Sequence, residues 1–223
     1  MPASTRPRRT QAERRTETRR KLLDAAIDCL VEYGYGGLTT AKVVERAGVT
    51  RGAQAHHFQT KAGLVIAAIR HLALIRAEQA FDRLGRVMTA EDPLGDALDL
   101  LWDVHNGPMF IATTELWLAA RTDPELRKQI TLVELASADG LGAFVRRFPV
   151  TEQLRHELEN FLYTAMDTVR GLMLAGFAEA DEARLPARWL RAKADLRTLA
   201  ETKLAANGVT WQQINKIVKN AAG

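Results

Sequence analysis

Residues 38–61 hold the side chains that are best suited to recognising nucleic acid. Arg51 can present two N–H groups to the O6 and N7 atoms of one guanine, a contact that discriminates between bases by about 1–3 kcal/mol. His56 follows on the same outer helix face, and Gly52 and Ala53 keep that face slim where it would meet the floor of a groove. These residue types at this spacing predict a helix that reads base edges in the DNA major groove.

Gln54 has two alternative roles in that helix. Its amide could bond to the N6 and N7 atoms of an adenine and complete the outer face with Arg51 and His56. Its position instead favours an inward orientation, as a partly buried and hydrogen-bonded glutamine, with Ala55 on the outer face. Both alternatives stay open, and Gln54 is counted among the candidate DNA contacts.

Other residues are placed to contact the phosphate backbone. Thr40 and Lys61 lie at the expected N-termini of helices, where a side chain, backbone N–H groups and the helix dipole can meet an anion together. Lys42 and His57 are further candidate contacts. The adjacent His56 and His57 do not indicate a metal site, because neighbouring helix residues point about 100° apart and no third ligand lies nearby in the sequence.

Two short helices joined by a tight turn would position these side chains. Thr39 or Thr40 caps the first helix, Gly48 makes the turn, and Thr50 caps the second helix. The apolar residues expected to lock the two together are Val43, Val44, Ala47, Val49, Ala53 and Phe58. A longer helix, expected from about Thr10 to Tyr33 and stopped by the glycines of GYGG, precedes them. This arrangement is a helix-turn-helix.

The chain begins with a basic arm, residues 1–18. Residues 1–21 contain eight Lys or Arg against two acidic residues, although the whole chain has a net charge of only +4. Arg8, Arg9, Arg14 and Arg15 are expected to precede the first helix, as in arms that contact the minor groove. Such an arm would add non-specific electrostatic affinity for DNA.

The segment LTTAKVVERAGVTRGAQAHHFQTKAGLV resembles the DNA-binding region of the TetR/AcrR family of transcriptional regulators, over about residues 19–70. The resemblance implies phosphate contacts from Thr40, His57 and Lys61. It implies base contacts from Arg51, Gly52, Ala53 and His56. It further implies a ligand-responsive homodimer, commonly a repressor, that binds a palindromic operator on double-stranded DNA and releases it when a small-molecule effector binds the C-terminal domain.

One pair of residues departs from the family pattern. Where the family usually has an aliphatic residue followed by tyrosine, this chain has Gln54 and Ala55. The phosphate contact of that tyrosine is therefore absent. The departure leaves open which side chains of the helix read the DNA.

Residues 71–223 are expected to form a helical regulatory and dimerisation domain, so the fold class is all-α and TetR-like. Proline marks several helix starts or breaks, at Pro93, Pro108, Pro124 and Pro149. Long helices are expected over about 151–178 and from Pro186 onwards. The resemblance implies that these two helices form a four-helix bundle with a second copy. The expected interface residues are Leu158, Leu162, Met166, Val169, Met173, Trp189, Leu196 and Leu199.

Large side chains are concentrated between residues 93 and 148. They could form plain core, or they could line the effector cavity that the resemblance implies. The candidate lining residues are Trp102, His105, Met109, Phe110, Trp117, Phe144, Met166 and Arg170. Arg170 could bind an anionic ligand, but an ion pair with Asp167, three residues before it, is favoured.

The rest of the sequence limits the class of protein. It holds no nucleophile elbow, phosphate-binding glycine loop, zinc-ligand spacing or CxxC motif, so we expect neither an enzyme nor a cofactor. Cys29 is the single cysteine and cannot form an internal disulfide. The absence of a secretory signal and of a long apolar run predicts a cytoplasmic location and no membrane partner. The alternatives are a dimeric helical scaffold and a membrane-surface protein that uses its basic arm.

Overall fold

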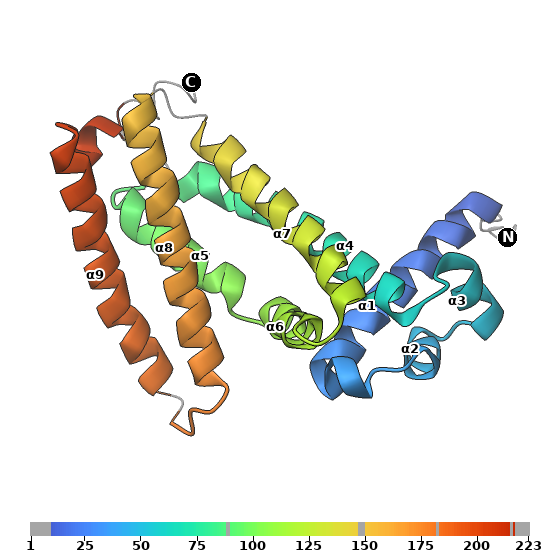
Figure 1. Ribbon diagram of the computed structural model, residues 1–223. Helices are drawn as coiled ribbons and strands as arrows, with labels where there is room; N and C mark the ends of the chain where they lie inside the picture. Colours follow the sequence, from blue (N-terminus) through green and yellow to red (C-terminus); the bar gives the residue numbers. More distant parts are fainter. Residues whose placement is uncertain (1–9, 88–89, 147–149, 182, 215, 217–223) are drawn as a thin grey trace, which may run out of the picture. The chain divides into compact units, whose positions relative to one another are not determined.

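The computed structural model describes residues 10–87, 90–146, 150–181, 183–214 and 216 (Figure 1). The described residues are helical or lie in loops, and none is in a strand. The helices are α1 (Gln11–Gly37), α2 (Thr40–Ala47), α3 (Arg51–His57), α4 (Lys61–Val87), α5 (Pro93–His105), α6 (Pro108–Ala120), α7 (Pro124–Val145), α8 (Glu152–Gly176) and α9 (Arg184–Ala206). The expected all-α fold class is confirmed.

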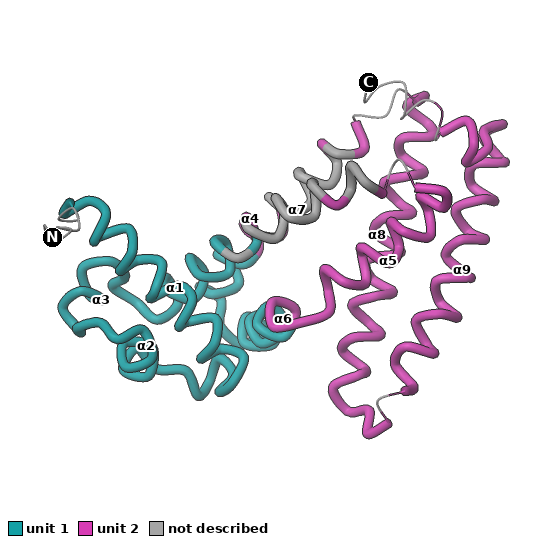
Figure 2. The backbone as a smooth tube through the Cα atoms, turned by 180° about the vertical axis from the view of Figure 1, so that it is seen from behind, with its two compact units in different colours: residues 1–73, 111–130 teal, residues 74–110, 131–223 magenta. Residues whose placement is uncertain are grey.

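The chain divides into two compact units, coloured separately in Figure 2. Unit 1 consists of residues 1–73 and 111–130, and unit 2 consists of residues 74–110 and 131–223. The first stretch of unit 1 ends at residue 73, three residues after the expected end of the DNA-binding domain at residue 70. The sequence gives no sign that residues 111–130, expected in the regulatory domain, group with unit 1.

Unit 1 is built around the apolar stripe of α1. Leu22, Leu23, Ala26 and Leu30 recur at three- and four-residue steps, and each is at most 1% exposed. This stripe packs against α2 and α3. The α-helical path of α1 breaks at Gly34, whose φ of 65° is left-handed, and a short turn continues to Gly37. The expected stop at the glycines is therefore a kink followed by one more turn.

Capping residues explain where several helices begin. The side chain of Thr39 accepts a hydrogen bond from Lys42 N, so Thr39 caps α2 and Thr40 is its first residue. Thr50, Asp92 and Thr151 cap α3, α5 and α8 in the same way. The expected start at Pro186 was wrong by two residues, because α9 begins at Arg184.

Unit 2 is organised around α8 and α9, which lie side by side and both contact α5 (Figure 1). Leu154 of α8, Leu204 of α9 and Ile214 form one buried cluster, each 2% exposed. Residues 211–214 form a short last helix. In the part of the chain that is described, no helix is long and apolar enough to cross a membrane.

Candidate nucleic-acid interface

A glycine turn sets the direction of α3 relative to α2 in unit 1. Gly48 has φ 62° and ψ 39°, a left-handed conformation that glycine adopts without steric cost. Its N–H and that of Val49 donate to carbonyls in the last turn of α2, at 3.2 Å to Glu45 O and 3.3 Å to Val44 O. Thr50 then caps α3 by accepting from Ala53 N at 3.2 Å. The helix-turn-helix geometry follows from these local bonds.

The outer surface of α3 consists of Arg51, Gly52, Ala55 and His56, which are all exposed. Ala53 and His57 are half-buried. Outside the neighbouring residues and the backbone of α3 itself, the described atom nearest to a Cβ built on Gly52 would be the Thr50 hydroxyl, at 4.0 Å. Nothing within the described chain therefore requires glycine at this position, and a close approach to a partner surface would explain it.

Gln54 faces inward. Its side chain is 8% exposed, and its Nε2 donates to the carbonyl of Phe58 at 2.6 Å. This bond closes the end of α3 beneath the surface that the outer residues form. The prediction that Gln54 contacts DNA is therefore wrong, because burial removes its amide from the outer face. Ala55 lies on that face instead.

Two lysines expected at the DNA backbone bond to the last turn of α1, just before α2. Lys42 Nζ donates to Gly37 O at 2.9 Å and lies 3.8 Å from the ring centroid of Tyr33. Lys61 Nζ donates to Tyr35 O and lies 4.2 Å from the centroid of the Tyr35 ring, while burial lowers the pKa of Lys61. Both ammonium groups thus hold the chain that leads into α2.

The helix α1 begins next to the expected start at Thr10, so Arg14 and Arg15 lie within it and do not precede it. Thr10 and Glu13 form a capping box, with Glu13 N donating to Thr10 Oγ1 at 3.2 Å, and this fixes the helix start at Gln11. Both arginines are exposed. Arg6, Arg8 and Arg9 lie outside the described residues. The basic segment is therefore in part a helix and not an arm up to residue 18.

Arginines of α1 reach the end of α3. Burial, and after it the charges of His56, Arg15 and Arg19, lowers the pKa of the half-buried His57. The guanidinium of Arg19 lies 5.6 Å from the ring centroid of Phe58. Arg19 was expected only as one of the basic residues 1–21, although its spacing of four residues from Arg15 places both on one face of α1.

Glu115 of α6 is a second residue that sequence reasoning missed. Its Oε2 accepts a hydrogen bond from the backbone N–H of Tyr35 at 3.0 Å, across 80 residues of sequence. The carboxylate lies against Gly34, where a Cβ would come within 2.6 Å of Oε2. No local pattern in the sequence signals a contact at such a separation.

The residues expected to line the effector cavity do not all lie in one unit of the structure. Trp117 belongs to unit 1, whereas the others belong to unit 2, and the side chain of Phe144 lies outside the described residues. Trp102 stacks on Trp189 with ring centroids 5.0 Å apart. Met109 and Met166 are half-buried.

His105 and Phe110 are close together in unit 2. Their ring centroids are 6.1 Å apart, and Phe110 is 6.1 Å from Phe177. Burial lowers the pKa of His105, a hydrogen bond with the carbonyl of Leu101 opposes this shift, and the charge of Arg170 adds to it. Arg170 forms an ion pair with Glu134 of α7, at 3.9 Å, a partner other than the expected Asp167.

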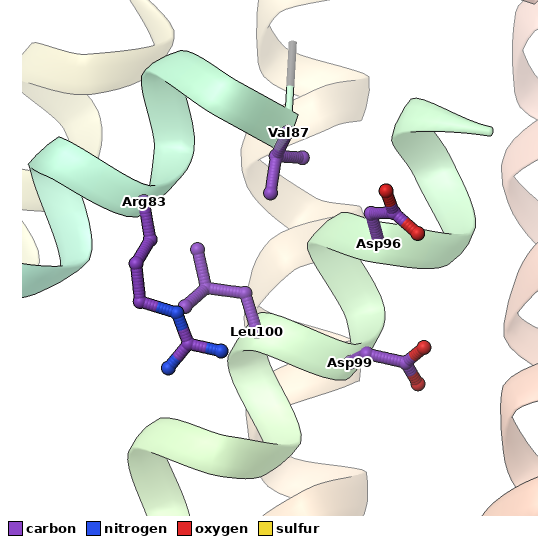
Figure 3. Close-up of a pocket in the computed structure, with 5 residues that line it drawn as sticks. All are labelled: Arg83, Val87, Asp96, Asp99 and Leu100. Atoms are coloured by element: carbon purple, nitrogen blue, oxygen red, sulfur yellow. The ribbon is translucent and has the colours of Figure 1, made fainter. Parts of the chain in front are cut away.

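One pocket in unit 2 has a volume of about 360 Å³ and shares no residue with the expected set. It is lined by Arg83, Val87, Asp96, Asp99 and Leu100, of which Arg83 and Leu100 point toward each other (Figure 3). Asp99 turns away from Arg83 and forms an ion pair with Lys193 at 2.6 Å. Among the described residues, no group of three or more His, Cys, Asp and Glu could hold a metal ion.

Four of the expected dimer-interface residues are buried within the single chain. Val169, Met173, Trp189 and Leu196 are at most 6% exposed, so they already belong to the core of unit 2. The prediction that these four residues form a dimer interface is therefore wrong, because other helices of the same chain already cover their apolar stripe. Leu158, Leu162, Met166 and Leu199 are half-buried.

Comparisons with known proteins agree with this geometry. A model of the bacterial regulatory proteins of the tetR family matches residues 22–68. The chain is 36% identical over 182 residues to the HTH-type transcriptional regulator CymR of Pseudomonas putida, which covers 79% of this chain and 88% of CymR. This chain belongs to the TetR family.

Two further known proteins are also similar to this chain. It is 28% identical over 153 residues to the HTH-type transcriptional repressor AcnR of Corynebacterium diphtheriae, covering 68% of this chain and 76% of AcnR. The crystal structure of the multidrug binding protein EbrR complexed with ethidium has a TM-score of 0.57 and 23% identity, covering 82% of this chain and 98% of EbrR. At that identity the structural likeness shows the fold alone. The relatives are transcriptional regulators, and this chain is one as well.

Proposed function

We propose that this regulator represses transcription as a homodimer bound to a palindromic operator, and that a small-molecule effector releases it. The observation that carries the proposal is the outer surface of α3, formed by Arg51, Gly52, Ala55 and His56. It combines a guanidinium that can read guanine with small residues that permit close approach to base edges. Thr40 lies at the start of α2, where a helix N-terminus favours a phosphate.

The face of α1 next to α3 extends the DNA-binding surface. Arg15 and Arg19 lower the pKa of His57, so their charges lie close to the end of the recognition helix. Positive charge at this place would contact the backbone and supply affinity without sequence preference. The imidazole of His57 would donate a hydrogen bond to a phosphate from this end of α3.

A second copy of the chain would pack against the exposed stripes of α8 and α9. Tyr163 and Leu174 of α8 are 43% and 49% exposed, and Leu190 of α9 is 67% exposed. Small residues at Gly171 and Ala194 share these exposed faces and permit close helix approach. Large apolar side chains at such exposure favour a protein partner, and a two-fold dimer would space two readers by about one DNA turn, roughly 34–36 Å.

The effector would bind in unit 2. Two places there support this part of the proposal: the group of His105, Phe110, Phe177 and Arg170, and the pocket between Arg83 and Leu100. EbrR shares the fold and binds ethidium, and AcnR is named a repressor. Release follows if the effector favours a conformation whose two readers no longer fit both half-sites.

Selection from a pool of random DNA duplexes tests this function. The wild-type protein is expected to enrich an inverted repeat whose half-sites are about one helical turn apart. A pool that enriches no inverted repeat would overturn the proposal and would favour the scaffold. Binding to anionic vesicles in place of any duplex would favour the membrane-surface protein.

Arg51→Ala and Arg121→Ala form a matched pair for the same experiment. Both remove one exposed arginine from unit 1, but Arg121 follows α6 and lies outside the helix-turn-helix. Arg51→Ala is expected to abolish enrichment of one or more base positions. Arg121→Ala is expected to enrich the same sequence as the wild type.

A further inference from the structure

The α1–α2 segment, residues 34–39, comprises the last turn of α1 after its kink and the two residues before α2. Side chains of three other helices bond to it. It begins at Gly34, whose left-handed φ of 65° interrupts α1, and the N–H of Leu38 donates back to Gly34 O at 3.1 Å. Lys42 of α2 donates to Gly37 O, and Lys61 of α4 donates to Tyr35 O. Glu115 of α6 accepts from Tyr35 N. The backbone of Tyr35 is thus fixed at both its N–H and its carbonyl.

Glu115 reaches this backbone because residue 34 is glycine. A Cβ at Gly34 would lie 2.6 Å from Glu115 Oε2, closer than Cβ atoms approach other atoms, and 3.2 Å from its Cδ, which is a tight contact. A carboxylate acceptor forms a stronger hydrogen bond than a neutral one. The two observations show a close fit between a side chain of α6 and the backbone of the α1–α2 segment.

The position of that backbone decides where α2 begins. Four residues after Gly34, Leu38 is 1% exposed and anchors the segment in the core of unit 1. Thr39 follows directly and caps α2, whose first residue is Thr40. A shift of the Tyr35 backbone would therefore move the N-terminus of α2, the end of that helix proposed to meet a phosphate.

We propose that Glu115 is a positioning residue for DNA binding: by holding the Tyr35 N–H, it fixes the N-terminus of α2 in the orientation that fits the DNA backbone. The inference rests on the proposed DNA-binding function. Glu115 itself does not touch DNA in this account, since its negative charge would repel a phosphate. It acts through the backbone between Gly34 and Thr39.

Three variants separate positioning from charge. Glu115→Ala removes the acceptor, Glu115→Gln keeps an acceptor oxygen without the charge, and Glu125→Ala removes an exposed carboxylate of α7 in the same unit. Loss of a negative charge alone strengthens binding to a polyanion. Loss of the Tyr35 hydrogen bond weakens it, so the two effects have opposite signs.

The experiment measures two quantities for each variant. One is the affinity for a duplex selected by the wild-type protein and for a random duplex of equal length, and the other is the hydrogen-exchange rate of the Tyr35 amide by NMR. In Glu115→Ala, the Tyr35 amide is expected to exchange about tenfold faster than in the wild type. The variant is expected to bind the selected duplex about tenfold more weakly. Glu115→Gln is expected to keep most of the wild-type protection of the Tyr35 amide and most of the wild-type affinity. Glu125→Ala is expected to leave the Tyr35 exchange rate unchanged and to bind the selected duplex as tightly as the wild type or more tightly.

A double variant adds an internal test. Gly34→Ala is expected to weaken DNA binding in two ways, by backbone strain at the positive φ of residue 34 and by displacing the Glu115 carboxylate. The loss caused by displacement should vanish when Gly34→Ala is combined with Glu115→Ala. Losses that simply add in the double variant would contradict a shared mechanism and overturn the inference.

The outcomes are distinct. Equal affinities of Glu115→Ala and Glu125→Ala for the selected duplex would overturn the positioning role and leave the proposed function standing. A Tyr35 amide that exchanges as slowly in Glu115→Ala as in the wild type would also overturn the positioning role and leave the proposed function standing. A wild-type protein that selects no duplex overturns the proposed function, and this inference falls with it.

Discussion

The exposed surfaces of α3 and of the α8–α9 pair differ in the chemistry they offer. On α3 the exposed residues are small or polar, with a guanidinium at Arg51 and no side chain at Gly52. On α8 and α9 the exposed residues include Leu174 and Leu190, which are at least 49% exposed. A slim, positively charged surface suits a polyanionic groove, and an exposed apolar one suits another protein chain. DNA binding and self-association are therefore expected to be separable by mutation.

The largest effect is expected for Trp189, which the apolar pattern assigns to the interface although it is 4% exposed. Its ring stacks on Trp102 with a centroid distance of 5.0 Å and an interplanar angle of 14°. Trp189→Ala should lower the free energy of unfolding by about 3–5 kcal/mol, measured by urea denaturation, because it removes a buried aromatic side chain. Leu118→Ala, at a position 57% exposed, is the control and should cost well under about 1 kcal/mol. A Trp189→Ala variant that unfolds like the wild type but associates more weakly would restore Trp189 to the interface.

Trp189 illustrates why unit 2 was harder to predict than unit 1. A stripe of apolar residues shows that one helix face is covered, but it does not show whether the same chain or a second copy covers it. Val169, Met173 and Leu196 share that ambiguity and turned out to be buried within the chain. The same limit applies to Arg170, whose partner Glu134 lies 36 residues away and not in the adjacent turn.

The helix-turn-helix was predictable because its determinants are local. Thr50 as a cap and Gly48 as a turn act through bonds that span at most five residues. The inward orientation of Gln54 was also favoured from its place in the helix, since the bond to Phe58 is four residues long. Glu115 was not predictable, because its contact with Tyr35 depends on how α6 packs in unit 1.

Arg51→Ala tests the α3 side of the comparison. Loss of a bidentate guanine contact should cost about 1–3 kcal/mol of discrimination in each half-site, and much less on random duplexes. Fluorescence anisotropy with a selected and a random duplex measures both affinities at one salt concentration. Arg121→Ala changes the net charge equally and serves as the control. Equal losses on the two duplexes would show that Arg51 contacts the backbone and does not read bases.

Leu190→Ala tests the α9 side. Leu190 is 67% exposed in the single chain, so its removal should leave the helical circular dichroism unchanged. If a second copy covers it, the dimer dissociation constant should rise by about two orders of magnitude, because roughly two methylene equivalents of apolar burial, at about 0.8 kcal/mol each, are lost from each of the two subunits. Sedimentation equilibrium measures this constant. An unchanged constant would place the interface away from Leu190.

The smallest effect is expected for His105 of unit 2, as a dependence of stability on pH. Burial lowers the pKa of His105, so the unfolded chain, with an ordinary histidine pKa near about 6.5, binds the proton more readily than the folded one. The stability associated with neutral His105 is present above that pH and is lost as the pH falls through it. His57, whose pKa is lowered as well, contributes in the same direction.

His105→Asn removes the titrating group of unit 2. The amide Nδ2 of asparagine can take the place of His105 Nδ1, which lies 2.9 Å from Leu101 O, so the hydrogen bond is kept while the titration is lost. Urea unfolding at pH 7.5 and 5.5 should show a smaller loss of stability for the variant than for the wild type, with the remaining part due to His57. An identical loss in both proteins would mean that His105 is charged without penalty in the folded state. In that case water would have to reach its ring, and the group that His105 forms with Phe110 would be open to solvent and better suited to a polar effector than to an apolar one.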